Sequence, residues 1–556
     1  MANRNEAELV FCPLGGVGEI GMNFALYGYG PAQKRKWMIV DVGVTFPDAT
    51  LPGVDLVLPD TRFIQSRLDD LAGIVITHAH EDHYGALLEL WPRLGRKKVW
   101  MTPFTAGLLE AKRQMDGGAE IPVEIFRAGD RFTVGPFDIE AINVTHSIPE
   151  PVSLAIRTPL GLVVHTGDWK IDSGPTIGEK TDEARFRALG DEGVRALICD
   201  STNAMREGDS PSEEQVGEGL RGVIEAAPGR VAITTFSSNV GRIRSIMEAS
   251  RDAGRQVLVL GTSMRRVINV ATELGYLDGL PEVVSEEDYG YIPRENIVVL
   301  CTGSQGEPRA ALAKLARDEM RSVALSPGDT VVYSSRVIPG NEKAILETKN
   351  QLIEQGIRII EDTDALVHVS GHPRRNELRR MYEWTRPQVL VPVHGEAAHL
   401  VAHGALGASA GIPEVAQVRN GDMIRLAPGA AEIIEQVPFG RIFKDGRLVG
   451  SEEDMGIKDR RKLSYVGHVA VNVVLDDRYE ISGDPDLVAI GVAAVDANGD
   501  DMEDLMLDAA IGAVESIPRV RRKDLNLVAE AVRRAVRASA NEAWGKKPIV
   551  TVFVTR

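Results

Sequence analysis

The stretch T-H-A-H-E-D-H-Y-G at residues 77–85 constrains this chain more than any other part of its sequence. It directly follows an apolar run that predicts a buried β-strand. In an extended backbone His78 and His80 point to the same side, so both imidazoles can converge on one cation. Asp82 and His83 follow where the chain must turn, and they point in different directions. These two side chains therefore suit a second cation beside the first.

Two divalent cations about 3.5 to 4 Å apart that share a water are a common apparatus for attack on a phosphodiester. Imidazole and carboxylate ligands favour zinc, and the carboxylates also admit harder ions. We therefore expect two divalent metal ions, zinc in the first place, with manganese or magnesium as alternatives. The competing interpretation is a polar loop with chance histidines, which requires four residue types to coincide in this order.

Ligand-type residues also stand at the ends of other predicted strands. Asp41 ends an apolar run, where it would orient a ligand histidine; capping a turn is the alternative role. His146 and Asp168 each follow a further predicted strand. We expect His146 to join His78 and His80 on one metal, and Asp168 to bridge to the other.

Residues 16–21, G-V-G-E-I-G, match the glycine pattern of dinucleotide-binding folds. That pattern requires a helix directly after it. Here residues 22–27 are apolar and residues 28–31 are rich in glycine, which predicts a strand and a turn. The glycines therefore indicate a β-hairpin with glycine bends.

The composition narrows the class of protein. A length of 556 residues suggests three or four domains. The three cysteines, Cys12, Cys199 and Cys301, stand far apart, which fits a reducing cytoplasm and argues against thiolate metal sites. Neither a signal peptide nor a membrane span is expected, so we predict a cytoplasmic protein. The net charge of −17 argues against a generally basic nucleic-acid binder but allows a local basic groove.

Helices and strands alternate over residues 206–361, as in a doubly wound α/β unit. Metal-type residues stand on both sides of this region, with D-S-T-N at 200–203 before it and histidines at 368–372 and 394 after it. We therefore interpret it as an insertion in the first domain.

The ordered set of Asp41, H-x-H-x-D-H, His146 and Asp168 resembles the metallo-β-lactamase superfamily. The D-S-T triplet and the late histidines resemble its β-CASP nucleases, and among these the chain is similar to the bacterial ribonuclease J family over essentially its whole length. The similar stretches are residues 15–23, 200–203, 300–308, 334–342, 368–372 and 392–396. The resemblance implies an α/β fold: a metallo-β-lactamase αββα sandwich with an inserted doubly wound β-CASP domain and a small α+β C-terminal domain.

The expected domain organisation follows from this resemblance and from the pattern of elements. The boundaries are the first part of the metallo-β-lactamase domain at 1–205, the β-CASP domain at 206–361, the second part of the metallo-β-lactamase domain at 362–445, a charged linker at 446–465 and the C-terminal domain at 466–556. The C-terminal domain carries no catalytic set of residues. The resemblance suggests that it supports dimerisation, and an autonomous accessory domain is the alternative.

The resemblance also implies residue roles. The metal ligands would be His78, His80 and His146 for one ion, Asp82, His83 and His394 for the other, and Asp168 between them. The substrate contacts would be Ser237, Ser238, Asn239, His368, Val369, Ser370, Gly371 and His372. Asp82 and His368 would be catalytic, with His368 as a proton donor, and Asp41 and Asp200 would support the ligands. For His368 and His372, capping of the helix expected from Pro373 to Trp384 is the alternative.

Arg374, Arg375, Arg379 and Arg380 lie on that expected helix and favour a grip on a polyanion. Two positions depart from the family pattern: Gly241 stands where relatives often carry histidine, and Thr262 stands where an arginine is expected. Both departures bear on recognition of the RNA 5′ end.

The resemblance implies a ribonuclease that acts on single-stranded RNA. It would be a 5′-to-3′ exonuclease that prefers a 5′-monophosphate and has some endonuclease activity, in RNA processing and decay. It would be a homodimer or homotetramer, with other RNA-decay proteins as further partners and no membrane. A small-molecule hydrolase of the lactonase or thioesterase type is one alternative, although it has no use for the insertion or the polyanion grip. The other alternative is a non-catalytic RNA-binding subunit.

Overall fold

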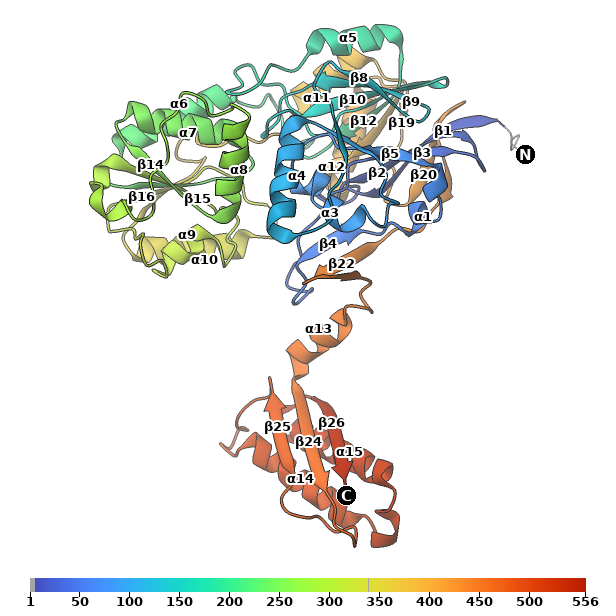
Figure 1. Cartoon of the computed structure of the whole chain (residues 1–556), viewed down its shortest axis with the longest axis vertical. Helices are drawn as coiled ribbons and strands as arrows, with labels where there is room; N and C mark the ends of the chain where they lie inside the picture. The colour runs from blue at the N-terminus through green and yellow to red at the C-terminus, as the bar shows by residue number, and fades with distance from the viewer. Residues whose placement is uncertain (1–5, 339) are drawn as a thin grey trace. The chain divides into compact units, whose positions relative to one another are not determined.

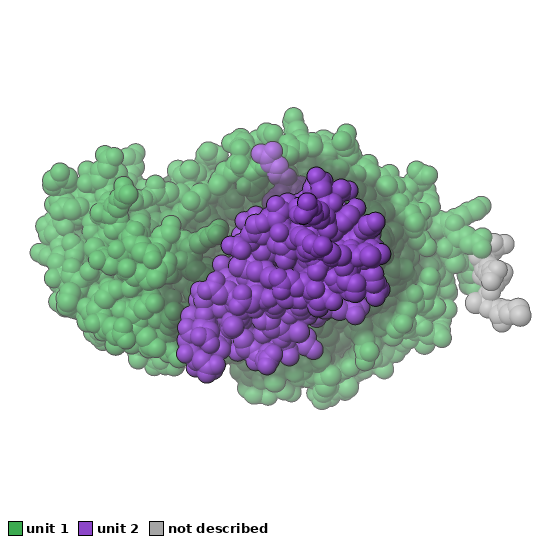
Figure 2. All heavy atoms as spheres, turned by 90° about the horizontal axis from the view of Figure 1, so that it is seen from below, with its two compact units in different colours: residues 1–45, 58–441 green, residues 46–57, 442–556 purple. Residues whose placement is uncertain are grey.

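The structure is a computed structural model, and it describes residues 6–338 and 340–556. The chain divides into two compact units (Figure 2). The first contains the chain up to Thr45 together with Leu58–Arg441, and the second contains Phe46–Val57 and Ile442–Arg556. Each unit has its own apolar core.

Two mixed sheets form the centre of the first unit (Figure 1). The first sheet contains, in spatial order, β21 (Glu432–Gln436), β20 (Asp422–Ala427), β1 (Ala7–Gly15), β2 (Phe24–Pro31), β3 (Lys36–Val40), β5 (Leu71–Val75), β6 (Val99–Met101) and β7 (Val123–Ile125). The second contains β19 (Glu414–Val415), β18 (Val389–Val393), β12 (Val194–Asp200), β11 (Gly161–His165), β10 (Val152–Thr158), β9 (Phe137–Asn143) and β8 (Arg131–Val134). Alternate side chains of both sheets meet in one core, among them Phe11 and Val40 from the first sheet and Ile156 and Ile198 from the second.

Helices cover the outer faces of this sandwich. The bounds are α1 (Arg62–Gln65), α2 (Glu81–Tyr84), α3 (Leu87–Leu90), α4 (Pro103–Asp116), α5 (Glu183–Glu192), α11 (Arg375–Thr385) and α12 (Ala397–Ser409). Phe186 of α5, Met381 of α11 and Leu406 of α12 pack against the outer face of the second sheet. The predicted αββα sandwich is confirmed.

The glycine-rich segment after β1 is part of a hairpin. Strand β1 pairs antiparallel with β2, in a register that joins Phe11 to Tyr27. Gly16 and Gly18 have positive φ angles of 82° and 81°, which glycine adopts without strain. The hairpin interpretation of the G-x-G-x-x-G pattern is therefore confirmed.

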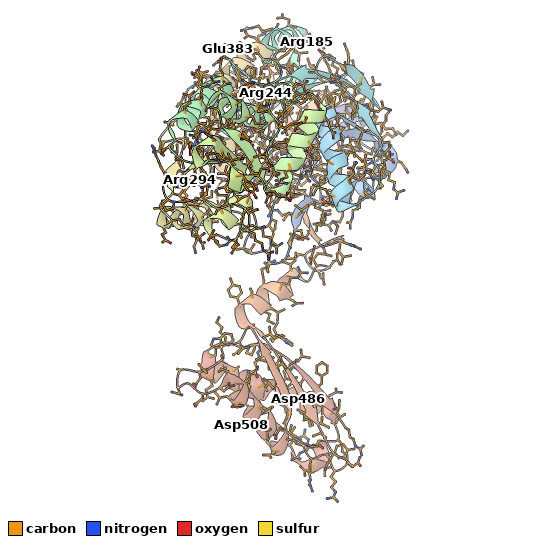
Figure 3. All side chains as sticks on the ribbon, turned by 60° about the vertical axis from the view of Figure 1, so that its left-hand side comes forward. Arg185, Arg244, Arg294, Glu383, Asp486 and Asp508 are labelled. Atoms are coloured by element: carbon orange, nitrogen blue, oxygen red, sulfur yellow. The ribbon has the colours of Figure 1, made fainter. Side chains whose placement is uncertain are left out.

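The predicted insertion contains a separate, parallel five-stranded sheet with helices packed on it. Its strands, in spatial order, are β14 (Gln256–Leu260), β15 (Ile297–Cys301), β13 (Val231–Thr234), β16 (Thr330–Tyr333) and β17 (Arg358–Ile360). Its helices are α6 (Glu213–Ala226), α7 (Val240–Asp252), α8 (Thr262–Glu273), α9 (Ala311–Ala316) and α10 (Glu342–Glu354). Arg294, labelled in Figure 3, donates to the buried Asp329 at 2.9 Å and ties two connections of this sheet together. The predicted doubly wound β-CASP domain is confirmed as a fold.

The second unit contains a three-stranded sheet with two helices packed on it. Strand β24 (His468–Val474) lies between antiparallel β25 (Asp486–Ile490) and parallel β26 (Ile549–Thr555). Helices α14 (Met502–Ser516) and α15 (Leu525–Trp544) cover its buried face, where Val471 and Val532 meet. The segment predicted as a linker carries strand β23 (Leu448–Gly450), paired with β22 (Arg441–Asp445), and helix α13 (Ile457–Val466).

Candidate metal centre

The candidate metal ligands lie at the carboxyl ends of strands from both sheets of the sandwich. Asp41 follows β3, residues 77–83 follow β5, His146 comes after β9, Asp168 comes after β11, Asp200 ends β12, and His394 follows β18. Strands β3 and β5 are parallel, and so are β11, β12 and β18. Their ends therefore meet at one edge of the sandwich, where ligands of α/β folds commonly bind.

The first cluster contains His78, His80, His146 and Asp168, whose ligand atoms all lie within 4.8 Å of one another. Nδ1 of His80 is 3.2 Å from Nε2 of His78 and 3.0 Å from Nε2 of His146. Oδ2 of Asp168 lies 3.8 Å from Nε2 of His78. Three imidazole nitrogens and a carboxylate thus face a common point, as one zinc ion requires.

The second cluster contains Asp82, His83, Asp168 and His394. Nε2 of His83 lies 3.2 Å from Oδ2 of Asp168 and 3.5 Å from Oδ2 of Asp82. Nε2 of His394 lies 3.2 Å from Oδ2 of Asp82. Asp168 belongs to both clusters, so its carboxylate would be shared by two cations if both clusters held one.

Asp41 and Asp200 hold the ring orientation of two histidines. Asp41 accepts a hydrogen bond from Nδ1 of His83 at 2.7 Å and from the backbone N–H of Thr77 at 2.8 Å. Asp200 lies 2.7 Å from Nδ1 of His372. Such partners fix which ring nitrogen faces the metal or the substrate.

The charges of the candidate ligands, like their positions, are suited to divalent cations. Burial and neighbouring histidines hold the pKa values of His78 and His146 well below the usual range, so their rings are neutral and can act as ligands. Burial opposes charge on His394, but Asp168, Asp200 and Asp82 outweigh it and raise its pKa to about 10. The clustered carboxylates thus require positive charge nearby, which divalent cations would supply.

Asp168 provides a second test of the fit. Its Oδ1 atom is buried and has no hydrogen-bond partner within the described part of the chain, although Nδ1 of His394 lies 3.3 Å away. A buried carboxylate oxygen without a partner is costly. A cation at this point would satisfy the oxygen.

The predicted substrate residues divide into those beside the metal ligands and those away from them. Oγ of Ser238 lies 3.1 Å from Nε2 of His80. The carbonyl oxygen of Gly371 accepts from Nδ1 of His146 at 2.6 Å. Asn239 instead caps helix α7, where its side chain accepts from the backbone N–H of Arg242.

His372 lies within the centre, whereas His368 does not join any of the candidate clusters found among the described residues. Asp168, Asp200, His372 and His394 form a third group of converging ligand atoms. His368 faces Arg242 and Glu213 instead. Its Nδ1 is buried without a hydrogen-bond partner, and burial followed by the charge of Arg242 lowers its pKa to about 3.

A buried network of charges lies behind His368. Arg242, which is fully buried, donates to both carboxylate oxygens of Glu213, at 2.8 Å for Oε2 and 3.1 Å for Oε1, and to the carbonyl oxygen of Val367 at 3.2 Å. Lys170, also fully buried, pairs with Asp172 at 2.7 Å and lies 3.6 Å from Glu213. The network joins the segment after Asp168 to both connections between the sandwich and the insertion.

The arginines of helix α11 differ from the sequence-based expectation. Arg375 pairs with Glu207 at 3.0 Å, and Arg380 pairs with Asp209. Both guanidinium groups thus have an acidic partner in a segment that lies far away in the sequence. Of the four arginines expected to grip a polyanion, two are therefore already neutralised within the chain.

Two residues that the sequence did not single out support the loop of residues 370–372, which is predicted to contact the substrate. Asn203 donates from Nδ2 to Oγ of Ser370 and to the carbonyl oxygen of His372, each at 3.0 Å. Arg336 in turn donates to Oδ1 of Asn203 at 2.9 Å. Both residues lie in stretches that resemble the family, 200–203 and 334–342, but the resemblance does not indicate that Arg336 would contact Asn203.

The two departures from the family pattern lie at different places. A β-carbon on Gly241 would approach Oγ1 of Thr176 to 2.7 Å, so this position has little room for a side chain without movement of Thr176. Gly241 also borders a cavity of about 750 Å³ that reaches His146 and Tyr276. Thr262 is the first residue of α8.

Models of known protein families match consecutive segments of the chain. The matches are a beta-lactamase superfamily domain at residues 38–206, the beta-CASP domain of ribonuclease J at 228–352, a Zn-dependent metallo-hydrolase RNA specificity domain at 356–416 and the ribonuclease J C-terminal domain at 455–556. Together with the geometry, they define a metal-dependent hydrolase of the metallo-β-lactamase superfamily that carries a β-CASP insertion.

Curated relatives narrow this class to one family. The chain is 63% identical to ribonuclease J of Sinorhizobium meliloti over 99% of its own length and 98% of the relative. It is 37% identical to ribonuclease J of Mycolicibacterium smegmatis, with 97% and 96% covered, and 34% identical to that of Thermus thermophilus, with 98% and 94% covered. The chain belongs to the ribonuclease J family and is a metal-dependent ribonuclease.

Solved structures agree with the fold. A crystal structure of a protein of unknown function from Enterococcus faecalis matches with a TM-score of 0.52 and 16% identity, over 75% of this chain and all of that one. At this identity the match supports the fold alone. Within residues 6–338 and 340–556, no helix combines the length and apolar character that crossing a bilayer requires.

Proposed function

We propose that this chain hydrolyses single-stranded RNA from the 5′ end, with a preference for a 5′-monophosphate and with additional endonuclease activity. The observation that supports it most is that Asp168 joins the first and second ligand clusters, which lie beside the loop of residues 370–372. A small-molecule hydrolase would need the clusters but not this loop or the insertion that supports it.

The residues proposed to hold the metals are those of the two clusters that share Asp168. When bound there, two divalent cations supply Lewis acidity and a water of lowered pKa. Zinc is proposed first because imidazoles dominate the donor set, with manganese or magnesium as alternatives.

The chain's own residues would position the RNA and move the leaving group's proton. Ser370 and the backbone of Gly371 lie next to His146, where they can contact the scissile phosphate. Asp200 binds Nδ1 of His372 and leaves Nε2 to give a proton to the departing oxygen. On this geometry we place the proton donor at His372, and we assign His368 to the support of the loop.

Replacement of His372 by alanine is expected to lower kcat for RNA cleavage about 10²-fold, the lower end of what a positioned proton donor contributes. His368→Ala is expected to cost less, because His368 lies outside the ligand clusters. Steady-state kinetics on one RNA measure both. His399→Ala on helix α12 is the control and should match the wild type. A His372→Ala enzyme with wild-type kcat would contradict the assignment of the proton donor.

A 5′-monophosphorylated RNA should be degraded at least about tenfold faster than the same RNA with a 5′-triphosphate. In an exonuclease the terminal phosphate lies one nucleotide from the scissile phosphate, where it can accept charge-assisted hydrogen bonds worth about 1.5 to 3 kcal/mol each. A site of that length has no room for the two further phosphates of a triphosphate. A time course on RNA labelled at either end measures the preference. It also separates mononucleotide release from internal cuts. Equal rates on both RNAs would refute the 5′-end preference.

The proposed domain boundaries and the proposed oligomeric state follow the resemblance to the family. We place the insertion at 206–361, between the two parts of the sandwich at 1–205 and 362–445, and the C-terminal domain at 466–556. We also propose a cytoplasmic homodimer or homotetramer in which the C-terminal domain supports dimerisation. Size-exclusion chromatography with light scattering tests the assembly. Assay of a lactone panel and metal analysis of the purified protein test the two alternative functions.

A further inference from the structure

Arg206, Arg336 and Arg374 lie close enough for their charges to interact, and their guanidinium groups have no acidic partner in the described part of the chain. Within the described ranges, none of the three guanidinium groups has a carboxylate oxygen within 4.0 Å, although Arg375 pairs with Glu207 and Arg380 with Asp209 close by. In a chain with a net charge of −17, arginines usually find an acidic partner. Three that do not, in one place, indicate a site for an external anion.

The three arginines come from separate segments that meet. Arg206 lies on the connection that leads into the insertion, Arg336 follows strand β16, and Arg374 directly precedes helix α11. The backbone N–H of Arg375 donates to the carbonyl oxygen of Arg206 at 3.0 Å, which brings Arg374 and Arg206 together. The fold therefore brings these segments together, and no shared acidic partner is needed to do so.

Their charges act on one another. Burial lowers the pKa of Arg206, and the charge of Arg374 lowers it further. Burial likewise lowers the pKa of Arg336, and then Arg206 and Arg374 lower it further. Asp362 is the acidic group that opposes this effect at both. Like charges held together cost free energy unless an anion binds between them.

This arginine cluster is connected to the proposed substrate loop. Arg336 donates from Nη1 to Oδ1 of Asn203 at 2.9 Å, and Asn203 donates to Oγ of Ser370 and to the carbonyl oxygen of His372 at 3.0 Å. The guanidinium group of Arg336 is therefore separated from Ser370 by a single side chain. An anion at the cluster would lie next to a phosphate held by the loop.

We propose that Arg206, Arg336 and Arg374 form a binding site for a backbone phosphate of the RNA, adjacent to the phosphate held by residues 370–372. The assignment rests on the proposed function. Guanidinium groups match phosphate oxygens in shape and charge, and arginine keeps its charge where burial would neutralise other bases. The site lies between the sandwich and the insertion, so it also explains what the insertion contributes to RNA binding.

The test is the affinity for a single-stranded RNA oligonucleotide, measured by fluorescence anisotropy in EDTA so that no cleavage occurs. Arg206→Gln and Arg374→Gln are each expected to weaken binding about tenfold, as loss of one charged hydrogen bond implies. Each should also reduce the slope of log Kd against log salt by about 0.7, the value for one phosphate contact on a single strand. Arg374→Lys should keep most of the slope, because it keeps the charge.

Arg380→Gln is the matched control, because Arg380 lies on the same helix but pairs with Asp209. It should leave affinity and slope unchanged, and thermal melting should show all variants folded. Oligonucleotides with a 5′-phosphate and with a 5′-hydroxyl should lose equal affinity.

A loss confined to the 5′-phosphorylated RNA would overturn the backbone assignment. Wild-type binding and cleavage together with unchanged slopes in Arg206→Gln and Arg374→Gln would overturn this site alone. Absence of RNA binding by the wild type would overturn the proposed function together with it.

Discussion

Replacement of His80 by alanine is expected to lower the rate of RNA cleavage by at least about 10³-fold while RNA still binds. Nδ1 of His80 faces Nε2 of both His78 and His146, so the variant loses one of three imidazoles from the first cluster. A bound cation contributes several kcal/mol of charge stabilisation, and each 1.36 kcal/mol is tenfold in rate. Single-turnover cleavage of labelled RNA measures the loss.

Two further measurements separate loss of the metal from loss of the fold. The metal content per chain should fall in His80→Ala, and the affinity for RNA measured in EDTA should stay within a few-fold of the wild type. His468→Ala is the control, since His468 lies in the second unit, where it contacts Thr551. Wild-type cleavage by a His80→Ala protein would remove His80 from the metal site.

Treatment of the wild type with a chelator should abolish cleavage, and added zinc or manganese should restore it.

The candidate metal ligands could be located from the sequence because each stands at or shortly after the end of a strand that the sequence marks clearly. The H-x-H-x-D-H stretch follows the apolar run of β5, and His146 and Asp168 follow runs that became β9 and β11. A strand end fixes both the position and the direction of its side chain within the sheet. Ligands that follow the parallel strands β3 and β5 and the parallel strands β11, β12 and β18 therefore meet at one edge of the sandwich.

The division of roles between His368 and His372 could not be predicted in the same way. Both stand in H-V-S-G-H outside a regular strand, so no alternation of side chains predicts which ring faces the metal centre. The orientation of each ring depends on its partners. Asp200 hydrogen-bonds to His372, whereas the charges of Arg242 and Glu213 act on His368. Those partners lie more than a hundred residues away from the loop along the chain, beyond the reach of local patterns.

Ion pairs between distant segments also explain why the sequence did not show which arginines of helix α11 are neutralised. Residues 374–380 contain four arginines and a single acid, Glu377, but Glu207 and Asp209 neutralise Arg375 and Arg380 from a distant segment. Helix α8 is a different case. Its buried residues Met264, Val267, Ile268 and Ala271 follow helical spacing. The sequence therefore does predict this helix by its apolar spacing.

Replacement of Arg242 by methionine is expected to destabilise the first unit by about 3 to 5 kcal/mol, the usual cost of leaving one partner of a buried ion pair alone. Arg242 and Glu213 are both buried, and the variant would leave the Glu213 carboxylate with Lys170 at 3.6 Å as its remaining cation. Urea unfolding followed by tryptophan fluorescence measures the change. Arg251→Met is the matched control on the same helix: Arg251 pairs with Asp252 at the surface, where such a pair contributes about 1 kcal/mol or less.

The same ion pair predicts the direction of a pH dependence. Burial opposes ionisation of Glu213, but Arg242 and Lys170 outweigh it and lower its pKa to about 2, below the ordinary value of 4.5. A carboxylate with a depressed pKa stabilises the folded state above its unfolded pKa, and this stabilisation is lost as the pH falls through the folded value. The difference in stability between the wild type and Arg242→Met should therefore narrow as the pH falls toward 2, where the wild type loses the contribution of the Glu213 charge. A difference that stays constant down to pH 2 would show that Glu213 and Arg242 do not stabilise the junction by their charges.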